Sequence, residues 1–167
     1  MPDGSFGANM LKASDAASLA EGVAGMLKQS ALVVAQAYVP TKFDWRIGVL
    51  DGQALFACRY RMARGHWQNV RRTEDGRVLE GGAQTLAISD VSEEVVNLAL
   101  RAARLIGDGL YGIDLKETDE GVFIEINDNP NLESHVEGAV IRDELWRKLI
   151  GWFEKRLEAR IGRVSGA

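Results

Sequence analysis

The chain lacks several features on which common protein classes depend. Its 167 residues include a single cysteine, Cys58, so no disulfide can form within the chain and no cysteine cluster can bind zinc. We interpret Cys58 as a small hydrophobic residue in a strand. No apolar run is long enough to span a bilayer, and the N-terminus has no signal-peptide pattern. These absences predict a cytoplasmic protein with no membrane partner.

A strong excess of one charge is also lacking. Twenty Lys and Arg stand against 24 Asp and Glu, so the formal net charge is −4 and no nucleic-acid partner is expected. The length and the 46% hydrophobic content suit one globular domain. Arginines between positions 59 and 77 make that segment locally basic, which fits either solvated hairpin edges or a wall that faces an anion.

The N-terminal half predicts one helix and several strands. Ser14 is the expected N-cap of a helix that ends near Ser30, and the valine-rich run at 31–36 has the length of a buried strand. Two further strands, 44–50 and 53–60, flank Asp51-Gly52, a pair that favours a tight hairpin turn. A shorter strand is expected at 67–71, before a turn at 74–76.

The C-terminal half predicts two helices around a second hairpin. Asp90 and Glu93 form a capping-box pattern that opens a helix. Strands follow at 110–116 and 122–127, and a last helix at 140–159 precedes a frayed tail. The expected inward residues are Val95, Leu98, Ala99, Ala102, Leu105 and Ile106 in the first helix, and Ile141, Leu145, Leu149, Trp152 and Phe153 in the last. The fold class is α/β (α+β) with a mostly antiparallel sheet flanked by helices.

The second hairpin carries two carboxylates and an amide. Side chains alternate along a strand, so Glu125 and Asn127 share one face, and a turn of even length places Asp114 on that face too. Like charges opposed across a sheet are destabilising, and a bound cation removes the conflict. Three oxygen donors suit Mg²⁺ or Mn²⁺. The alternative interpretation is a solvated hairpin face.

A succession of short motifs now points to a family. They are Pro2-Asp3-Gly4-Ser5-Phe6-Gly7, Gln36-Ala37-Tyr38-Val39, Asp44-Trp45-Arg46-Ile47, Gly109-Leu110-Tyr111-Gly112-Ile113-Asp114 and Glu125-Ile126-Asn127-Asp128-Asn129-Pro130-Asn131. In this order and spacing they resemble the ATP-grasp superfamily, and most closely the ligases similar to the RimK ribosomal-protein glutamate ligase. The resemblance extends over nearly the whole chain and implies an ATP-grasp fold.

The resemblance also implies roles for individual residues. Asp114, Glu125 and Asn127 are expected to hold Mg²⁺ (or Mn²⁺) against the ATP phosphates, and Arg46 to face the phosphates or the reacting acyl phosphate as the catalytic residue. The alternative for Arg46 is a salt bridge to a neighbouring acid. Asp44 is expected to accept a hydrogen bond from the ribose. The rest of the implied nucleotide-binding set is Gly4, Ser5, Phe6 and Gly7 over the phosphates, Tyr38 and Val39 at the adenine, and Lys12, Gln36 and Asn69.

Two departures from the family pattern affect this interpretation. The chain begins after the strand on which the family carries a lysine, so we expect residues 1–30 to be a remnant of the small lobe, 31–160 the large lobe and 161–167 the tail. His66-Trp67-Gln68-Asn69 stands in place of the family's Arg-Ser-Asn, which leaves the substrate class open. His66 and His135 are interpreted as ordinary loop residues.

The activity that the resemblance implies is ATP-dependent joining of a carboxylate to an amino-acid or peptide amine through an acyl phosphate. One alternative is a nucleotide-binding fragment without catalysis, because the lysine and the preceding lobe are missing. Another is a metal-dependent phosphohydrolase, but the adenine-binding segment argues against that reaction. The acid, the amine and the oligomeric state stay open.

Overall fold

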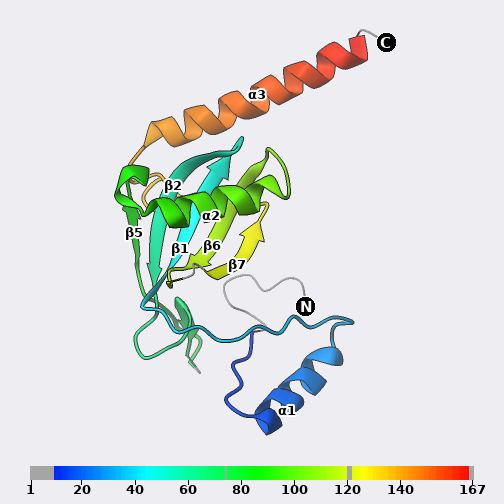
Figure 1. The fold of residues 1–167 in the computed structure, drawn as a ribbon, viewed down its shortest axis with the longest axis vertical. Helices are drawn as coiled ribbons and strands as arrows, with labels where there is room; N and C mark the ends of the chain where they lie inside the picture. The colour runs from blue at the N-terminus through cyan, green and yellow to red at the C-terminus, as the bar shows by residue number, and fades with distance from the viewer. Residues whose placement is uncertain (1–9, 74, 120–121, 166–167) are drawn as a thin grey trace.

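A five-stranded antiparallel sheet in the order β5-β2-β1-β6-β7 forms the centre of the fold. A computed structural model describes residues 10–73, 75–119 and 122–165, and Figure 1 shows the arrangement. The elements are α1 (Ala16–Leu27), β1 (Phe43–Leu50), β2 (Gln53–Arg61), β3 (Val70–Arg72), β4 (Val78–Glu80), β5 (Ala83–Leu86), the 3₁₀ turn η2 (Ile88–Asp90), α2 (Glu93–Arg104), β6 (Leu110–Lys116), β7 (Val122–Asn127) and α3 (Asp143–Ser165). The predicted mixed class with an antiparallel sheet is confirmed.

Both predicted hairpins are present. Asp51 and Gly52 join β1 to β2 with φ angles of 52° and 70°, the left-handed backbone that the Asp-Gly signal requires. β6 and β7 have the bounds expected from the sequence. The shorter strand is β3, which pairs with β4 in a separate two-stranded sheet. Gly76, with a φ of 81°, lies in the turn between them, whereas Glu74 is outside the described residues.

One face of the five-stranded sheet forms the main hydrophobic core. Alternation along β1 places Trp45, Ile47 and Val49 on this face, where all three are buried. Val95 and Ala99 of α2 pack against them, and Figure 1 shows α2 lying across the sheet. We call this side the core face.

The opposite face is covered in part by the segment that follows β7. Phe56 and Cys58 of β2 are buried there beneath Leu145 of α3, with Leu132 and Val136 of the preceding loop beside them. The interpretation of Cys58 as a buried strand residue is confirmed. No helix in the described part of the chain is long and apolar enough to span a membrane.

The expected strand at 31–36 does not form. The segment has no regular secondary structure, and Leu32 and Val34 are 80% and 83% exposed. A strand needs a neighbour for its backbone N–H and C=O groups, and no described strand pairs with this segment. The expected N-cap Ser14 is also wrong by one position. Asp15 caps α1, because its carboxylate accepts a 2.8 Å hydrogen bond from the Ser18 N–H in a capping box.

The two later helices begin and end elsewhere than predicted. Residues 88–90 form η2, so α2 begins at Glu93 with Ser92, not Asp90, as its N-cap. It ends at Arg104, which leaves the expected core residues Leu105 and Ile106 beyond its end and exposed.

α3 begins three residues later than expected, since Arg142 has a φ of 50° that a helix cannot include. The helix continues to Ser165 through most of the expected tail. Phe153, expected to point inward, is 49% exposed because it lies on the side of α3 away from the sheet cluster.

Candidate functional site

Three charged side chains form a row across neighbouring strands on the face opposite the core face. Arg46 of β1 pairs in register with Asp114 of β6, which pairs in turn with Glu125 of β7. Directly opposed residues in a sheet share a face, so the expectation that Asp114 and Glu125 face the same side is confirmed. This holds although the register shifts between Asp114 and Leu115. Asn127 lies one pleat further along β7, and we call this side the site face.

Arg46 and Asp114 form a bidentate ion pair. The Arg46 Nε donates to Asp114 Oδ1 at 2.7 Å and Nη2 donates to Oδ2 at 2.6 Å, and both side chains are mostly buried. Burial alone would lower the pKa of the guanidinium, but the hydrogen bonds and charge of Asp114 outweigh it and raise that pKa. Arg46 therefore forms the salt bridge to a neighbouring acid that was the alternative expected for it from the sequence.

Glu125 is the carboxylate of the row for which no ion pair is found among the described residues. Partial burial raises its pKa, and the charge of Asp114 and a hydrogen bond between the two carboxyl groups raise it further, while Arg46 opposes the shift. Glu125 therefore keeps its proton to a higher pH in the folded protein than in the unfolded chain. A cation at this position would favour the ionised form.

The raised pKa of Glu125 predicts how stability depends on pH. The folded state keeps this proton at pH values where the unfolded state has lost it, so the contribution of Glu125 to stability falls as pH rises from about 4.3 through the folded pKa. Urea unfolding of the unmodified chain and of Glu125→Gln, compared across pH, isolates this contribution. We expect Glu125→Gln to be the more stable protein above the folded pKa and its advantage to shrink as pH falls. A difference that does not change with pH would contradict the assignment.

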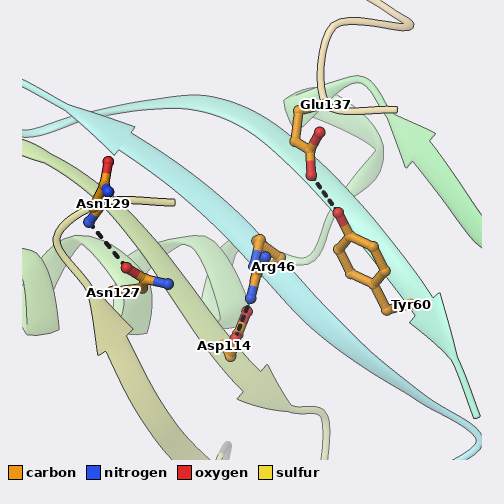
Figure 2. A network of polar contacts seen from close by, with 6 residues as sticks. All are labelled: Arg46, Tyr60, Asp114, Asn127, Asn129 and Glu137. Carbon is orange, nitrogen blue, oxygen red and sulfur yellow. Dashed lines mark hydrogen bonds and ion pairs between the residues drawn. The ribbon is translucent and has the colours of Figure 1, made fainter. Parts of the chain in front are cut away.

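A buried acid that sequence reasoning missed lies next to the row. The side chain of Glu137 belongs to a residue that is 2% exposed, and it accepts hydrogen bonds from the Tyr60 hydroxyl and, at 2.8 Å, from the Glu133 N–H. The Tyr60 ring centroid lies 5.4 Å from Arg46 Cζ, and Figure 2 shows these residues together. Burial and Glu137 both raise the pKa of Tyr60. Glu137 sits in an irregular loop, where no periodicity distinguishes a buried acid from an exposed one.

Asp44 has a cation partner that the sequence analysis did not single out. The Lys116 Nζ donates to Asp44 Oδ1 at 2.6 Å, and the Thr41 hydroxyl donates to the same oxygen at 2.8 Å. Alternation along β6, which places residues 114 and 116 on one face, could have identified Lys116. Both of these hydrogen bonds go to Oδ1 of Asp44.

The other expected nucleotide-binding residues that the structure describes make their contacts away from the charged row. Lys12 Nζ lies 3.5 Å from the ring centroid of Tyr38, whose ring stands edge-on to Trp67. Gln36 is exposed and Val39 is half-buried, and the Asn69 carbonyl accepts a hydrogen bond from the Gly81 N–H. Gly4, Ser5, Phe6 and Gly7 lie outside the described residues.

The row fits a divalent cation by its charge and its donors. The carboxylates of Asp114, Glu125 and Glu137 surround a single guanidinium, that of Arg46, which leaves an excess of negative charge. Asn127 adds an amide oxygen, which accepts a 2.9 Å hydrogen bond from the Asn129 N–H (Figure 2). The described residues contain no group of three or more His, Cys, Asp and Glu that could hold a metal ion. The ligand set of Asp114, Glu125 and Asn127 stays a prediction.

A glycine lets the loop after β7 approach this site. A Cβ added to Gly112 would lie 2.9 Å from the Pro130 Cβ and 3.8 Å from the Arg46 Cδ. Pro130 is buried against β6, and it follows directly on the turn made by Asn127 and Asn129. A side chain at position 112 would therefore displace the turn that places the amide oxygen.

Comparison with known proteins agrees with this geometry. The RimK-like ATP-grasp domain family matches residues 2–151. Tetrahydromethanopterin:alpha-L-glutamate ligase from Methanocaldococcus jannaschii is 31% identical over 110 residues, 64% of this chain and 34% of that ligase. The D-alanine–D-alanine ligase from Bacillus anthracis superposes with a TM-score of 0.62 at 16% identity, over 87% of this chain and 50% of that one. The chain thus spans about a third of the first relative and half of the second. With nearly all of its length matched, the chain belongs to the RimK-like ATP-grasp domain family.

Proposed function

We propose that this chain supplies the nucleotide- and metal-binding part of an ATP-dependent carboxylate–amine ligase. ATP-grasp domains in general use ATP and a divalent metal ion, and their ligases act on a carboxylate and an amine. The observation that supports the proposal for this chain is the row of Arg46, Asp114 and Glu125 on one face of a RimK-like domain. We infer Mg²⁺ or Mn²⁺ as the ion and an amino-acid or peptide amine as the acceptor.

The residues of the row have distinct roles in this proposal. Asp114, Glu125 and Asn127 would hold the metal, which neutralises charge on the ATP phosphates when bound. A carboxylate oxygen of the substrate attacks the γ-phosphorus of ATP and ADP leaves, which gives an acyl phosphate. The amine nitrogen then attacks the acyl carbon, phosphate leaves, and the amine loses a proton. Arg46 would stabilise the charge on the transferred phosphoryl group and then on the departing phosphate.

Nucleotide binding and phosphate release test this proposal together. We expect calorimetry to show ATP binding that depends on Mg²⁺, and an amino-acid mixture to accelerate phosphate release from ATP. Glu154→Gln, which changes an exposed acid on α3 far from the row, serves as the control that should leave both unchanged. Binding without accelerated release would indicate a nucleotide-binding domain only. A rate of phosphate release that is the same with and without the amino acids would indicate a phosphohydrolase.

Asp44→Ala tests the proposed ribose contact. A hydrogen bond to a charged acceptor contributes about 1.5–3 kcal/mol, so we expect ATP to bind roughly tenfold or more weakly, with little change in metal affinity. The same loss should appear when the unmodified chain binds 2′,3′-dideoxy-ATP. Because Asp44 also pairs with Lys116, Lys116→Met provides a matched control for loss of the ion pair alone. Equal affinity for ATP and the dideoxy analogue would exclude the ribose role.

A further inference from the structure

Glu137 is an unusual residue for a loop. It is almost fully buried, and it receives donors from the Tyr60 hydroxyl and the Glu133 N–H. No lysine, arginine or histidine in the described part of the chain forms a salt bridge with it. Burying a carboxylate without a paired cation is costly, and its hydrogen bonds offset only part of that cost.

Tyr60 connects Glu137 to a nearby cation, Arg46. The phenol donates its hydroxyl hydrogen to Glu137, and the Arg46 guanidinium lies 5.4 Å from the centre of the same ring. A hydrogen bond to a carboxylate makes the phenol ring more electron-rich, which strengthens its attraction for a cation. Figure 2 shows Glu137, Tyr60 and Arg46 in this order.

Arg46 is thereby attracted from both sides of its own strand. Asp114 approaches from β6 and the Tyr60 ring from β2, and these two strands flank β1. A divalent cation on Asp114 would weaken the ion pair, because metal and guanidinium compete for the same two oxygens. The contact between the guanidinium and the Tyr60 ring does not involve the Asp114 oxygens, so a cation on Asp114 would leave it in place.

We propose that Glu137 is a positioning residue for Arg46, acting through Tyr60. It holds the guanidinium at the end of the carboxylate row and keeps it on the site face when the cation takes Asp114. The part that concerns phosphate rests on the proposed function, whereas the placement of Arg46 can be tested without nucleotide. The loop that carries Glu137 is independently fastened to β5, because the Thr85 hydroxyl donates to the Val136 carbonyl. Removing the Tyr60–Glu137 contact should therefore leave the loop attached.

The test measures solvent exchange of the Arg46 Nε–H by NMR. The resonance is assigned by its absence in Arg46→Lys. We expect exchange to be roughly tenfold faster in Tyr60→Phe and in Glu137→Gln than in the unmodified chain, which corresponds to about 1.4 kcal/mol. The double variant should exchange no faster than either single variant, because both changes interrupt the same contact between Glu137 and Arg46. Tyr111→Phe, a buried tyrosine on the core face, and Glu133→Gln, an exposed acid of the same loop, should leave the exchange unchanged.

A second readout separates positioning from folding and from the proposed function. Both variants should weaken binding of Mg·ATP but not of adenosine, which has no phosphates for Arg46 to meet. Unchanged Arg46 exchange in both variants would overturn the proposal, and so would a uniform increase over the backbone amides of β2 and the loop. If Glu137→Gln does not fold, Tyr60→Phe decides, because it keeps the ring. If the unmodified chain binds no ATP, the proposed function fails while the exchange result still decides where Arg46 is held.

Discussion

Replacing Glu125 by alanine is expected to abolish the Mg²⁺-dependent part of ATP binding while the fold stays intact. Glu125 supplies one of the two carboxylates proposed to hold the cation, and its loss leaves Asp114 paired with Arg46 alone. We expect a loss of about 100-fold or more in ATP affinity measured with Mg²⁺ by calorimetry. The thermal midpoint should not fall, because the substitution removes one of two carboxylates that oppose each other on neighbouring strands.

Two comparisons make this prediction specific to the metal. ATP affinity measured in EDTA should be equal for Glu125→Ala and the unmodified chain, and Glu154→Gln on α3 should bind Mg·ATP normally. An unchanged Mg·ATP affinity in Glu125→Ala would count decisively against the metal assignment. A lower thermal midpoint together with equal losses in EDTA and in Mg²⁺ would show a structural role instead.

Arg46→Ala is expected to have opposite effects on metal binding and on turnover. The guanidinium binds both Asp114 oxygens, so its removal frees them for a cation. Hydrogen bonds to charged groups contribute about 1.5–3 kcal/mol, which predicts an increase of roughly 10- to 100-fold in Mg²⁺ affinity. Loss of a group that stabilises transition-state charge typically lowers turnover by about 10²–10³-fold, and we expect that loss in ATP-dependent ligation.

The opposite signs distinguish this role from simple damage to the fold. Calorimetric titration with Mg²⁺ alone measures the first effect, and phosphate release in the amino-acid mixture measures the second. Arg104→Ala, which removes an exposed arginine from α2, should change neither. A fall in Mg²⁺ affinity in Arg46→Ala would mean that Arg46 supports the cation site rather than competing for it.

Sequence patterns predicted the parts of the fold that local chemistry determines. Asp51-Gly52 identified the first hairpin, since few residue pairs accept positive φ, and the spacing of Asp114 and Glu125 identified two carboxylates on one face. The family motifs alone were enough to predict the RimK-like ATP-grasp domain.

The predictions failed, or a residue was missed, where the local sequence does not determine the structure. Val34 belongs to a run with the composition of a strand. Whether that run forms a strand and becomes buried depends on a pairing partner elsewhere in the chain, which the composition of the run does not reveal. Ser92 rather than Asp90 caps α2 because Asp90 is itself the last residue of a 3₁₀ turn, and both residue types are good caps. Glu137 is buried through tertiary contacts with Tyr60, and nothing in its local sequence indicates them.

The alternation over the first half of β1 has a consequence for how this domain can change. Odd-numbered positions such as Trp45 and Ile47 pack beneath α2, whereas the even-numbered Asp44 and Arg46 point to the site face. In this part of β1 the residues that pack in the main core and those proposed to contact ligands are therefore interleaved in sequence but lie on opposite faces of the sheet. Natural variation can exchange the polar set without opening a void in the core. A library randomised only at positions 44 and 46 should accordingly retain folded members, each with its own preference for an anion, whereas Gly48 and Leu50 are packed against neighbouring side chains and must be kept.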